Sequence, residues 1–333
     1  MTGEKEGEAQ LLERIHDHQK HLKEAKAEIS KVVVGQQAII DGFLRAIISN
    51  GSVLVEGVPG IAKTLIVRAL SRVMGCSFNR IQFTPDLLPT DIIGITTYEK
   101  ERGFYVLKGP IFANFILADE INRAPPKVQS ALLEAMQEKQ VTIGRETFPV
   151  PMPFFVLATQ NPIESVGTYP LPEAQIDRFL FKLNIIYPSK AEEKLVLNRN
   201  ITIAKFEQYD LQQISSPQLI TDMQETSKQI FCDEKIQDYI VQIVDVTRNP
   251  KKYAIKSSKY IEWGASPRAS IGLHIAAKAD ALMKGKNFVT PHNVKEVAPD
   301  VLRHRIIINY EGQSEGITTD QVIEEILSRV PVP

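Results

Sequence analysis

Five apolar runs of strand length recur through the first part of the chain, and this recurrence limits its possible folds more than any other feature. The runs span residues 52–55, 78–83, 114–118, 154–158 and 180–186. Short runs of this kind are typical of strands that are buried on both faces. Helical patterns lie between them, for example over Lys63–Met74 and Pro126–Glu138. Strands that alternate with helices predict a parallel sheet covered by helices on both sides.

The pattern changes after Pro188, where strand-length runs nearly vanish and the apolar spacing becomes helical. These later helical patterns cover residues 191–200, 234–247, 267–284 and 291–304. A chain of 333 residues is also too long for one small core. We therefore expect an α/β domain over residues 1–187, which includes an amphipathic N-terminal helix at about residues 11–29, and a mostly helical domain over 188–333.

Bulk composition narrows the class of protein. Hydrophobic residues make up 43% and charged residues 24% of the chain, and no stretch approaches the roughly 18 apolar residues of a membrane span. The start, MTGEKEGEAQ, lacks the apolar segment of a secretory signal peptide. The net charge of −1 disfavours a nucleic-acid partner, although the net charge does not exclude a local basic patch. We expect a cytoplasmic protein without a membrane span.

The cysteines and histidines predict neither a disulfide framework nor a metal centre. Cys76 and Cys232 lie far apart and outside any Cys-x-x-Cys or Cys/His cluster. Of His16, His18 and His21, only the last two share helical spacing. We expect two buried, reduced thiols and histidines on a solvated helix surface.

The segment SVLVEGVPGIAKTLIVRAL places a glycine-rich loop between a predicted strand and a predicted helix, which is the context of a P-loop. Glycines let backbone N–H groups converge on phosphate oxygens, and the helix N-terminus adds its positive end. Lys63 would supply a point charge, and Thr64 a hydroxyl for Mg²⁺. Ala62 stands where the usual glycine precedes the lysine, so its backbone must tolerate a Cβ. The predicted nucleotide-binding residues of this segment are Gly57, Pro59, Gly60, Ile61, Ala62, Lys63, Thr64 and Leu65. The alternative is a glycine-rich turn that binds no ligand.

Two acids end the third apolar run, in FILADEIN. The carboxyl ends of parallel strands face the ligand crevice of an open α/β sheet. Asp119 would therefore hold Mg²⁺, and Glu120 would orient and deprotonate the attacking water. By itself, a strand that ends in two acids is more often a solvated strand end. The P-loop upstream favours the catalytic interpretation.

Three further segments are specific enough to indicate a family. PFFVLATQNP places Asn161 after another apolar run, LPEAQIDRF carries Arg178, and GASPRAS carries Arg268. Together with DEINRAPPKVQSALLEAMQE, they resemble the MoxR family of AAA+ ATPases, and the resemblance extends from about Val33 to the end of the chain. It implies that Asn161 is the sensor-1 residue, Arg178 the arginine finger and Arg268 the sensor-2 residue.

The resemblance also implies a fold, a ligand and an assembly. AAA+ proteins have a five-stranded parallel sheet and a helical lid with the nucleotide between them, so Val34, Gly35 and Gln36 would lie near the adenine of ATP. Arg178 would act on the nucleotide of a neighbouring subunit, which requires a homo-oligomer, usually a hexameric ring. Arg268 would touch the γ-phosphate from the lid.

The same residues have ordinary alternatives. Asn161 precedes a proline and could be a turn residue, and an arginine is often one half of a surface ion pair. Arg123 is a second candidate interface residue, without an assigned role. Residues 91–107 and 140–150 resemble two hairpins of this AAA+ branch that would contact a substrate, and without the resemblance both are plain surface hairpins.

The leading hypothesis is an ATPase that uses ATP and Mg²⁺ for chaperone-like remodelling or maturation of a partner protein, which in this family is often a von Willebrand factor A domain protein. One alternative is an AAA+ motor that acts on DNA, which the near-neutral charge disfavours. Another is a nucleotide-gated scaffold that never hydrolyses ATP, which Glu120, Asn161 and Arg178 disfavour. The chain has no Asn-Lys-x-Asp guanine motif, so we expect adenine rather than guanine.

Overall fold

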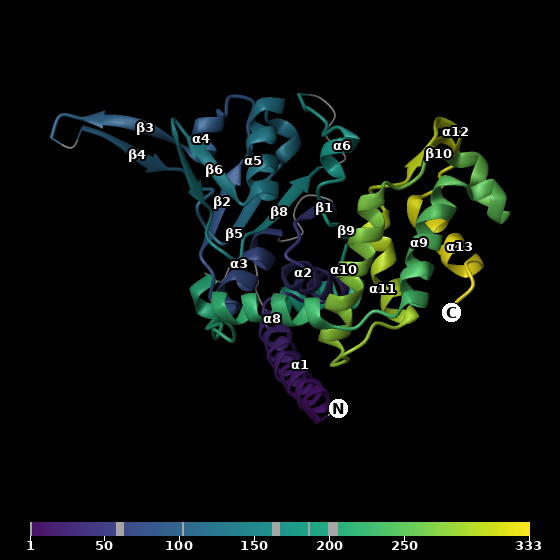
Figure 1. The fold of residues 1–333 in the computed structure, drawn as a ribbon. Helices are drawn as coiled ribbons and strands as arrows, with labels where there is room; N and C mark the ends of the chain where they lie inside the picture. Colours follow the sequence, from purple (N-terminus) through teal and green to yellow (C-terminus); the bar gives the residue numbers. More distant parts are fainter. Residues whose placement is uncertain (1, 58–62, 102, 162–166, 186, 199–205) are drawn as a thin grey trace. The chain divides into compact units, whose positions relative to one another are not determined.

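The computed structural model describes all residues except 1, 58–62, 102, 162–166, 186 and 199–205. The chain divides into two compact units (Figure 1). Unit 1 comprises Met1–Leu22, Leu180–Lys182 and Asp222–Pro333, and unit 2 comprises Lys23–Phe179 and Leu183–Thr221. The division passes through helices α1 (Thr2–Ile29) and α8 (Pro217–Gln229). The boundary that we predicted after residue 187 stays a proposal about functional domains.

Unit 2 is built on a five-stranded sheet with the order β2-β5-β8-β1-β9. The ladders β2–β5, β5–β8 and β8–β1 are parallel. Parallel pairing explains why the central strands β1, β5 and β8 are apolar along most of their length, since helices cover both faces of such a sheet. The strand bounds are β1 (Val53–Gly57), β2 (Phe78–Gln82), β5 (Phe115–Asp119), β8 (Phe155–Gln160) and β9 (Phe181–Ile185). All five predicted strands are confirmed.

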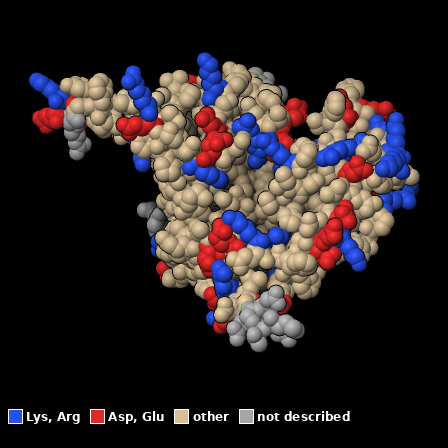
Figure 2. All heavy atoms as spheres, in the orientation of Figure 1, with Lys and Arg blue, Asp and Glu red and all other residues tan. Residues whose placement is uncertain are grey.

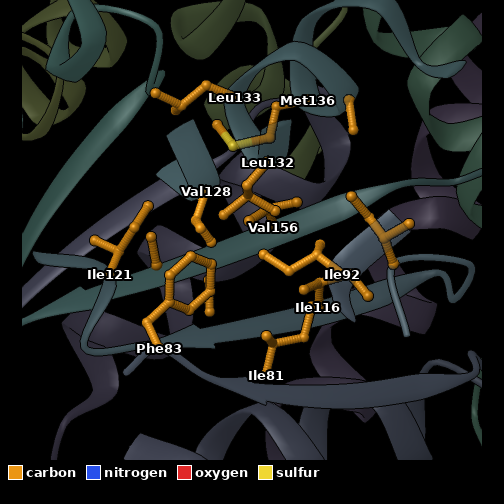
Figure 3. Packing of buried hydrophobic residues seen from close by; sticks show 14 of the residues in the cluster. Ile81, Phe83, Ile92, Ile116, Ile121, Val128, Leu132, Leu133, Met136 and Val156 are labelled. Carbon is orange, nitrogen blue, oxygen red and sulfur yellow. The ribbon is translucent and has the colours of Figure 1, made fainter. Parts of the chain in front are cut away.

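Helix α5 of unit 2 buries its apolar face against this sheet. From α5, Val128, Leu132 and Met136 pack against Ile116 of β5 and Val156 of β8 (Figure 3). The helices of this unit are α2 (Gln37–Ile48), α3 (Lys63–Val73), α4 (Pro89–Ile93), α5 (Pro126–Glu138), α6 (Glu173–Ile176) and α7 (Lys190–Asn198), with short 3-10 turns η1 (Ile121–Arg123) and η2 (Phe206–Tyr209). The predicted helix at Pro126–Glu138 is confirmed, and the one at Lys63–Met74 ends one residue earlier.

Two hairpins extend unit 2. One pairs β3 (Gly94–Glu99) with β4 (Gly103–Lys108) and projects away from the sheet (Figure 1), and the other pairs β6 (Gln140–Ile143) with β7 (Glu146–Pro149). Near the tip of the first, the rings of Tyr98 and Phe104 lie 5.1 Å apart, and both side chains are exposed. Both predicted hairpins are confirmed, although residues 91–93 belong to α4 rather than to a strand.

Unit 1 is mostly helical. Its helices are α9 (Glu234–Arg248), α10 (Pro267–Met283), α11 (Pro291–Leu302), α12 (Tyr310–Ser314) and α13 (Thr319–Arg329), with 3-10 turns η3 (Pro250–Tyr253) and η4 (Lys256–Tyr260) and a ribbon of β10 (Ile261–Trp263) and β11 (Ile307–Ile308). Side-chain caps begin these helices: Asp233 accepts the N–H of Lys235 at the start of α9, and Ser266 accepts that of Arg268 at the start of α10. Helices α10 and α11 approach closely at Gly272, where a Cβ would lie 3.1 Å from Val301.

The first part of α1 packs within unit 1. His18 is 2% exposed, and its Nε2 lies 3.1 Å from Oγ1 of Thr226 and 3.2 Å from a carboxylate oxygen of Asp222. Burial lowers the pKa of His18. Our expectation of solvated histidines is therefore wrong for His18, because the apolar spacing around it did not reveal that a polar helix would cover this position.

Both cysteines are free thiols, as expected, but only Cys232 is fully buried, whereas Cys76 is half-buried. Burial raises the pKa of Cys76 to about 12. Acidic and basic side chains intermingle on the face shown in Figure 2. In the described part of the chain, no helix is long and apolar enough to cross a membrane, and no three acidic, histidine or cysteine side chains group as metal ligands.

Candidate functional site

The candidate site lies in unit 2, at the edge of the sheet where the neighbouring strands β1, β8 and β5 end. Gly57 is the last residue of β1, Gln160 that of β8 and Asp119 that of β5. Because these strands are parallel neighbours, their carboxyl ends meet at one edge of the sheet, where open α/β folds bind ligands. We call this region the carboxyl edge.

Lys63 reaches back from the first turn of α3 toward β1. Its Nζ donates a hydrogen bond to the carbonyl oxygen of Gly57 at 2.7 Å. Burial lowers the pKa of Lys63, and nearby carboxylates, Asp119 first among them, oppose this shift. An ammonium on a flexible four-carbon side chain can exchange such a carbonyl contact for a phosphate.

The rest of the predicted P-loop is only partly described. Thr64 and Leu65 follow Lys63 in the first turn of α3, and both are half-buried. Gly57 is tightly packed, since a Cβ there would lie 2.8 Å from the carbonyl oxygen of Ile185 in β9. Glycine is therefore required at this position. The remaining predicted residues of the loop, Pro59, Gly60, Ile61 and Ala62, lie outside the described residues.

Asp119 is surrounded by hydrogen-bond donors. Its Oδ2 accepts from Nε of Arg80 at 3.0 Å and from Nη2 of Arg80 at 2.6 Å, and its Oδ1 accepts from the hydroxyl of Thr159 at 2.7 Å. Thr159 is 1% exposed and lies in β8, the strand next to β5. The carboxylate is thus held in one orientation at the end of its strand.

Glu120 leaves the strand in a left-handed conformation, with φ 57° and ψ 50°. Few residues other than glycine adopt this region, and they do so mostly where other contacts impose it. Here the N–H of Glu120 donates to Oγ1 of Thr159 at 2.8 Å, while Oε2 accepts from Nε2 of Gln82 at 2.8 Å and lies 3.0 Å from Nε of Arg123. Asp119 and Glu120 are therefore both tied to one hydroxyl, that of Thr159.

Asn161 is half-buried and directly follows Gln160, the last residue of β8, which pairs with Glu56 of β1. Asn161 is thus placed beyond the same carboxyl edge as Asp119. Arg178 follows α6 and is exposed, and its N–H donates to the carbonyl oxygen of Gln175. Because this arginine side chain is exposed, it can contact another molecule.

Val34, Gly35 and Gln36 form a half-buried loop before α2. Gly35 has φ 72° and Gln36 has φ 42°. A Cβ on Gly35 would lie 2.3 Å from Oε1 of Glu192 in α7, so the loop and α7 approach closely. Their predicted position near adenine stays a prediction. Arg268 belongs to unit 1, where it is exposed at the second position of α10.

Three side chains of this site were not predicted: Arg80, Gln82 and Thr159. A signal was present, because Arg80 and Gln82 are two residues apart in β2 and therefore face the same side of the strand. Thr159 is likewise a polar residue near the end of an apolar run. Arg123, predicted as an interface residue without a role, contacts Glu120.

The donor set suits the ligands that the sequence implies. The hydroxyl of Thr64 and the carboxylate of Asp119 are hard oxygen donors, as Mg²⁺ requires. Cationic groups already lie against these acids, since Arg80 contacts Asp119 at 2.6 Å and Arg123 contacts Glu120. The carboxyl edge thus attracts positive charge, and Lys63 beside it can attract phosphate.

Comparisons with known proteins show the family to which the chain belongs. The family model described as "ATPase family associated with various cellular activities (AAA)" matches residues 52–181, and the model of an AAA lid domain matches residues 254–326. The chain is 48% identical to a protein of Mycobacterium tuberculosis named Chaperone MoxR1, over 94% of this chain and 82% of that protein. It is 29% identical to Protein MoxR of Methylorubrum extorquens, over 92% of this chain and 93% of that one.

A solved structure has the same fold. A crystal structure from Cytophaga hutchinsonii, whose protein is described only as a candidate ATPase, matches with a TM-score of 0.91 and 47% identity, over 100% of both chains. At this identity the likeness extends beyond the arrangement of helices and strands to the residues that they carry. The predicted core and lid are therefore the architecture of a known family.

Proposed function

Because the chain belongs to the MoxR family of AAA+ ATPases, we propose that it binds ATP with Mg²⁺ and hydrolyses the ATP at the carboxyl edge of unit 2. One observation carries this proposal. The buried hydroxyl of Thr159 bonds to the carboxylate of Asp119 and to the backbone N–H of Glu120. Lys63 begins α3, the helix that follows β1, and β1 lies two strands from β5 in the sheet. A phosphate-binding cation and two fixed carboxylates are the parts that phosphoryl transfer to water needs.

The metal and the phosphates are held by separate groups. Thr64 and Asp119 would hold Mg²⁺, which would neutralise the negative charge of the phosphates. Lys63 exchanges its bond to the carbonyl of Gly57 for the phosphate oxygens. Arg268 contacts the γ-phosphate from unit 1, and the loop at Val34–Gln36 borders the adenine.

Glu120 is the general base. Its carboxylate orients the attacking water and takes its proton, while Gln82 and Arg123 hold that carboxylate in place. Asn161, beyond the end of the neighbouring strand, positions the same water or the γ-phosphate. Arg178 completes the site of an adjacent subunit by stabilising the charge of the transition state, so that the active form is a homo-oligomer, a hexameric ring.

The work driven by hydrolysis is the remodelling of a partner protein. A relative at 48% identity bears the name chaperone, which supports this role for the present chain. The exposed aromatic residues Tyr98 and Phe104 on the β3–β4 hairpin offer a contact for such a partner. A von Willebrand factor A domain protein is the partner class that we propose to test first, by affinity capture.

The decisive experiment compares Glu120→Gln with the unchanged chain. The variant keeps the shape of the side chain but cannot accept a proton, so turnover of ATP should fall about 100-fold or more while ATP binding persists. Phosphate release measures turnover, and calorimetry measures binding. Glu134→Gln, an exposed substitution on α5, is the matched control and should hydrolyse ATP normally.

Two results would contradict the proposal. If the unchanged chain releases no phosphate from Mg²⁺–ATP, it is a nucleotide-gated scaffold rather than an ATPase. If Glu120→Gln hydrolyses ATP at the normal rate, another group is the base. Nucleotide recovered from the incubated variant should be ATP, and recovery of ADP would argue against the role given to Glu120.

A further inference from the structure

Arg80 is bound to the proposed metal ligand. It lies in β2, with its Cα facing Leu117 of the neighbouring strand, two residues before Asp119. Its Nε and Nη2 lie 3.0 and 2.6 Å from Oδ2 of Asp119. The other carboxylate oxygen, Oδ1, accepts the hydroxyl of Thr159 at 2.7 Å. Both oxygens of Asp119 are therefore engaged by the protein itself.

A metal ion cannot simply be added to this arrangement. A guanidinium and a divalent cation repel each other, and Arg80 already places two N–H groups on Oδ2, so a metal that binds Asp119 through Oδ2 displaces Arg80. The displacement is feasible because the Arg80 side chain is 48% exposed, although that of Asp119 is only 16% exposed, and solvent weakens the ion pair on its Arg80 side. Thr159, which is buried, keeps its bond to Oδ1 meanwhile.

The released guanidinium has a second partner nearby. Nη2 of Arg80 also donates to Oε1 of Gln82 at 2.7 Å, and Nε2 of Gln82 donates to Glu120 at 2.8 Å. One row of side chains on β2 thus reaches from the proposed metal ligand to the proposed base. A cation that leaves Asp119 can remain at Gln82, near the phosphates.

We propose that Arg80 is a positioning residue that occupies Asp119 until the metal and nucleotide arrive, and that it thereby sets how strongly nucleotide binding depends on Mg²⁺. This inference rests on the proposed function, because it needs a site for Mg²⁺–ATP. Without metal, Arg80 shields the phosphates from the negative charge of Asp119. With metal, it competes for the same oxygen.

The test measures affinity without any turnover. Calorimetry gives the Kd of the non-hydrolysable analogue AMP-PNP in EDTA and again in saturating Mg²⁺. The Kd in EDTA divided by the Kd in Mg²⁺ measures how strongly binding depends on the metal. Binding of Mg²⁺ to AMP-PNP in solution is the same for every variant, so a change in the ratio reports the protein's part. In Arg80→Ala, metal-free nucleotide meets the unshielded charge of Asp119, so its Kd should rise. Metal-bound nucleotide no longer competes with Arg80 for Asp119, so its Kd should fall. The ratio should therefore rise about three- to tenfold.

The controls separate this role from a structural one. Arg145→Ala removes an exposed arginine from the β6–β7 hairpin of unit 2 and should leave the ratio unchanged. Arg80→Gln, which can keep a hydrogen bond to Gln82, repeats the test if the alanine variant fails to fold, and should give the same rise. An unchanged or smaller ratio in a folded variant overturns the role of Arg80 alone. Failure of the unchanged chain to bind AMP-PNP with Mg²⁺ instead overturns the proposed function, and this inference with it.

Discussion

At the scale of single residues, Thr159 has an unusual number of functions for one hydroxyl. It accepts the N–H of Glu120, donates to Asp119, and is 1% exposed. The bond to Glu120 also supports a backbone conformation that non-glycine residues rarely adopt. One buried hydroxyl thus holds the carboxylate of Asp119 and the backbone of Glu120 in place.

Thr159→Val tests this at constant shape. The valine removes the hydroxyl and leaves a part-buried N–H at Glu120 without that partner, so the free energy of unfolding should fall by about 1–3 kcal/mol. Urea unfolding measures the loss, and Thr159→Ser should restore most of it. Thr142→Val removes a hydroxyl that bonds to Thr147 on an exposed hairpin, and should change stability by less than about 0.5 kcal/mol. Equal stability of Thr159→Val and the unchanged chain would show that the hydroxyl supports nothing.

At the scale of elements, the loop at Val34–Gln36 depends on the backbone of Gly35. Its φ of 72° is strained for any residue with a Cβ, and a Cβ would also meet Glu192 of α7. The loop is therefore shaped both by its own backbone and by the helix against it. If it borders the adenine, a disturbance there should reach nucleotide binding.

Gly35→Ala is expected to do two things. The positive φ should cost about 1–2 kcal/mol of unfolding free energy, and displacement of the loop should weaken ATP binding. The control is Gly316→Ala, which has φ 71° but nothing within 4 Å of the added Cβ. It should lose similar stability and bind ATP normally. Normal ATP affinity in both variants would remove the loop from the nucleotide site.

The junction between α5 and β6 holds a partly buried lysine. Lys139 directly follows α5 with φ 53°, and its Nζ donates to the carbonyl oxygen of Phe154 at 3.3 Å. Burial lowers the pKa of Lys139 from 10.5 to about 8. Between these two values the unfolded chain binds more protons than the folded one, so stability rises with pH in that window.

This junction gives a prediction about pH. The free energy of unfolding should gain about 1–3 kcal/mol from Lys139 between pH 8 and 10.5. Urea unfolding at pH 8 and pH 10 measures it, and Lys139→Met should lack this part of the rise. Lys127→Met, an exposed lysine on the same helix, should retain it. An identical pH dependence in all three proteins would mean that the Lys139 ammonium is solvated.

At the scale of the whole molecule, the proposed site is incomplete within one chain. Glu120 belongs to the carboxyl edge of its own subunit, whereas Arg178 is exposed after α6. If Arg178 acts on a neighbouring subunit, the two functions can be separated genetically. Two inactive variants would then form complete sites when they assemble into one ring, because each supplies the residue that the other lacks.

Mixing Glu120→Gln with Arg178→Ala tests the assembly. Each variant alone should bind ATP and hydrolyse it poorly, because a finger arginine is worth about 10³ to 10⁵ in rate. In randomly mixed rings about a quarter of the sites combine an intact Glu120 with an intact Arg178 from the neighbour, so ATPase activity should return. Native mass spectrometry confirms that the rings are mixed. No recovery in mixed rings would mean that Arg178 acts within its own chain or only supports the fold.

Most of the fold could be predicted from local pattern, and the exceptions have a physical cause. The central strands β1, β5 and β8 are buried on both faces along most of their length, so their apolar runs mark them directly. Helix α8 was not predicted, because the face that it buries includes polar side chains. Gln224, Thr226 and Ser227 are all buried there, and a polar buried face leaves little apolar periodicity to read.

The sequence by itself predicted the family, the five strands and the proposed site residues, since a glycine-rich loop before Lys63 and two acids at a strand end are local patterns. Only the tertiary structure decided which side chains surround those acids. Arg80 and Thr159 lie 39 and 40 positions from Asp119 along the chain, and they meet it because β2 and β8 flank β5 in the sheet. Strand order follows from the packing of the whole unit rather than from the order of residues, so no local pattern could reveal these contacts.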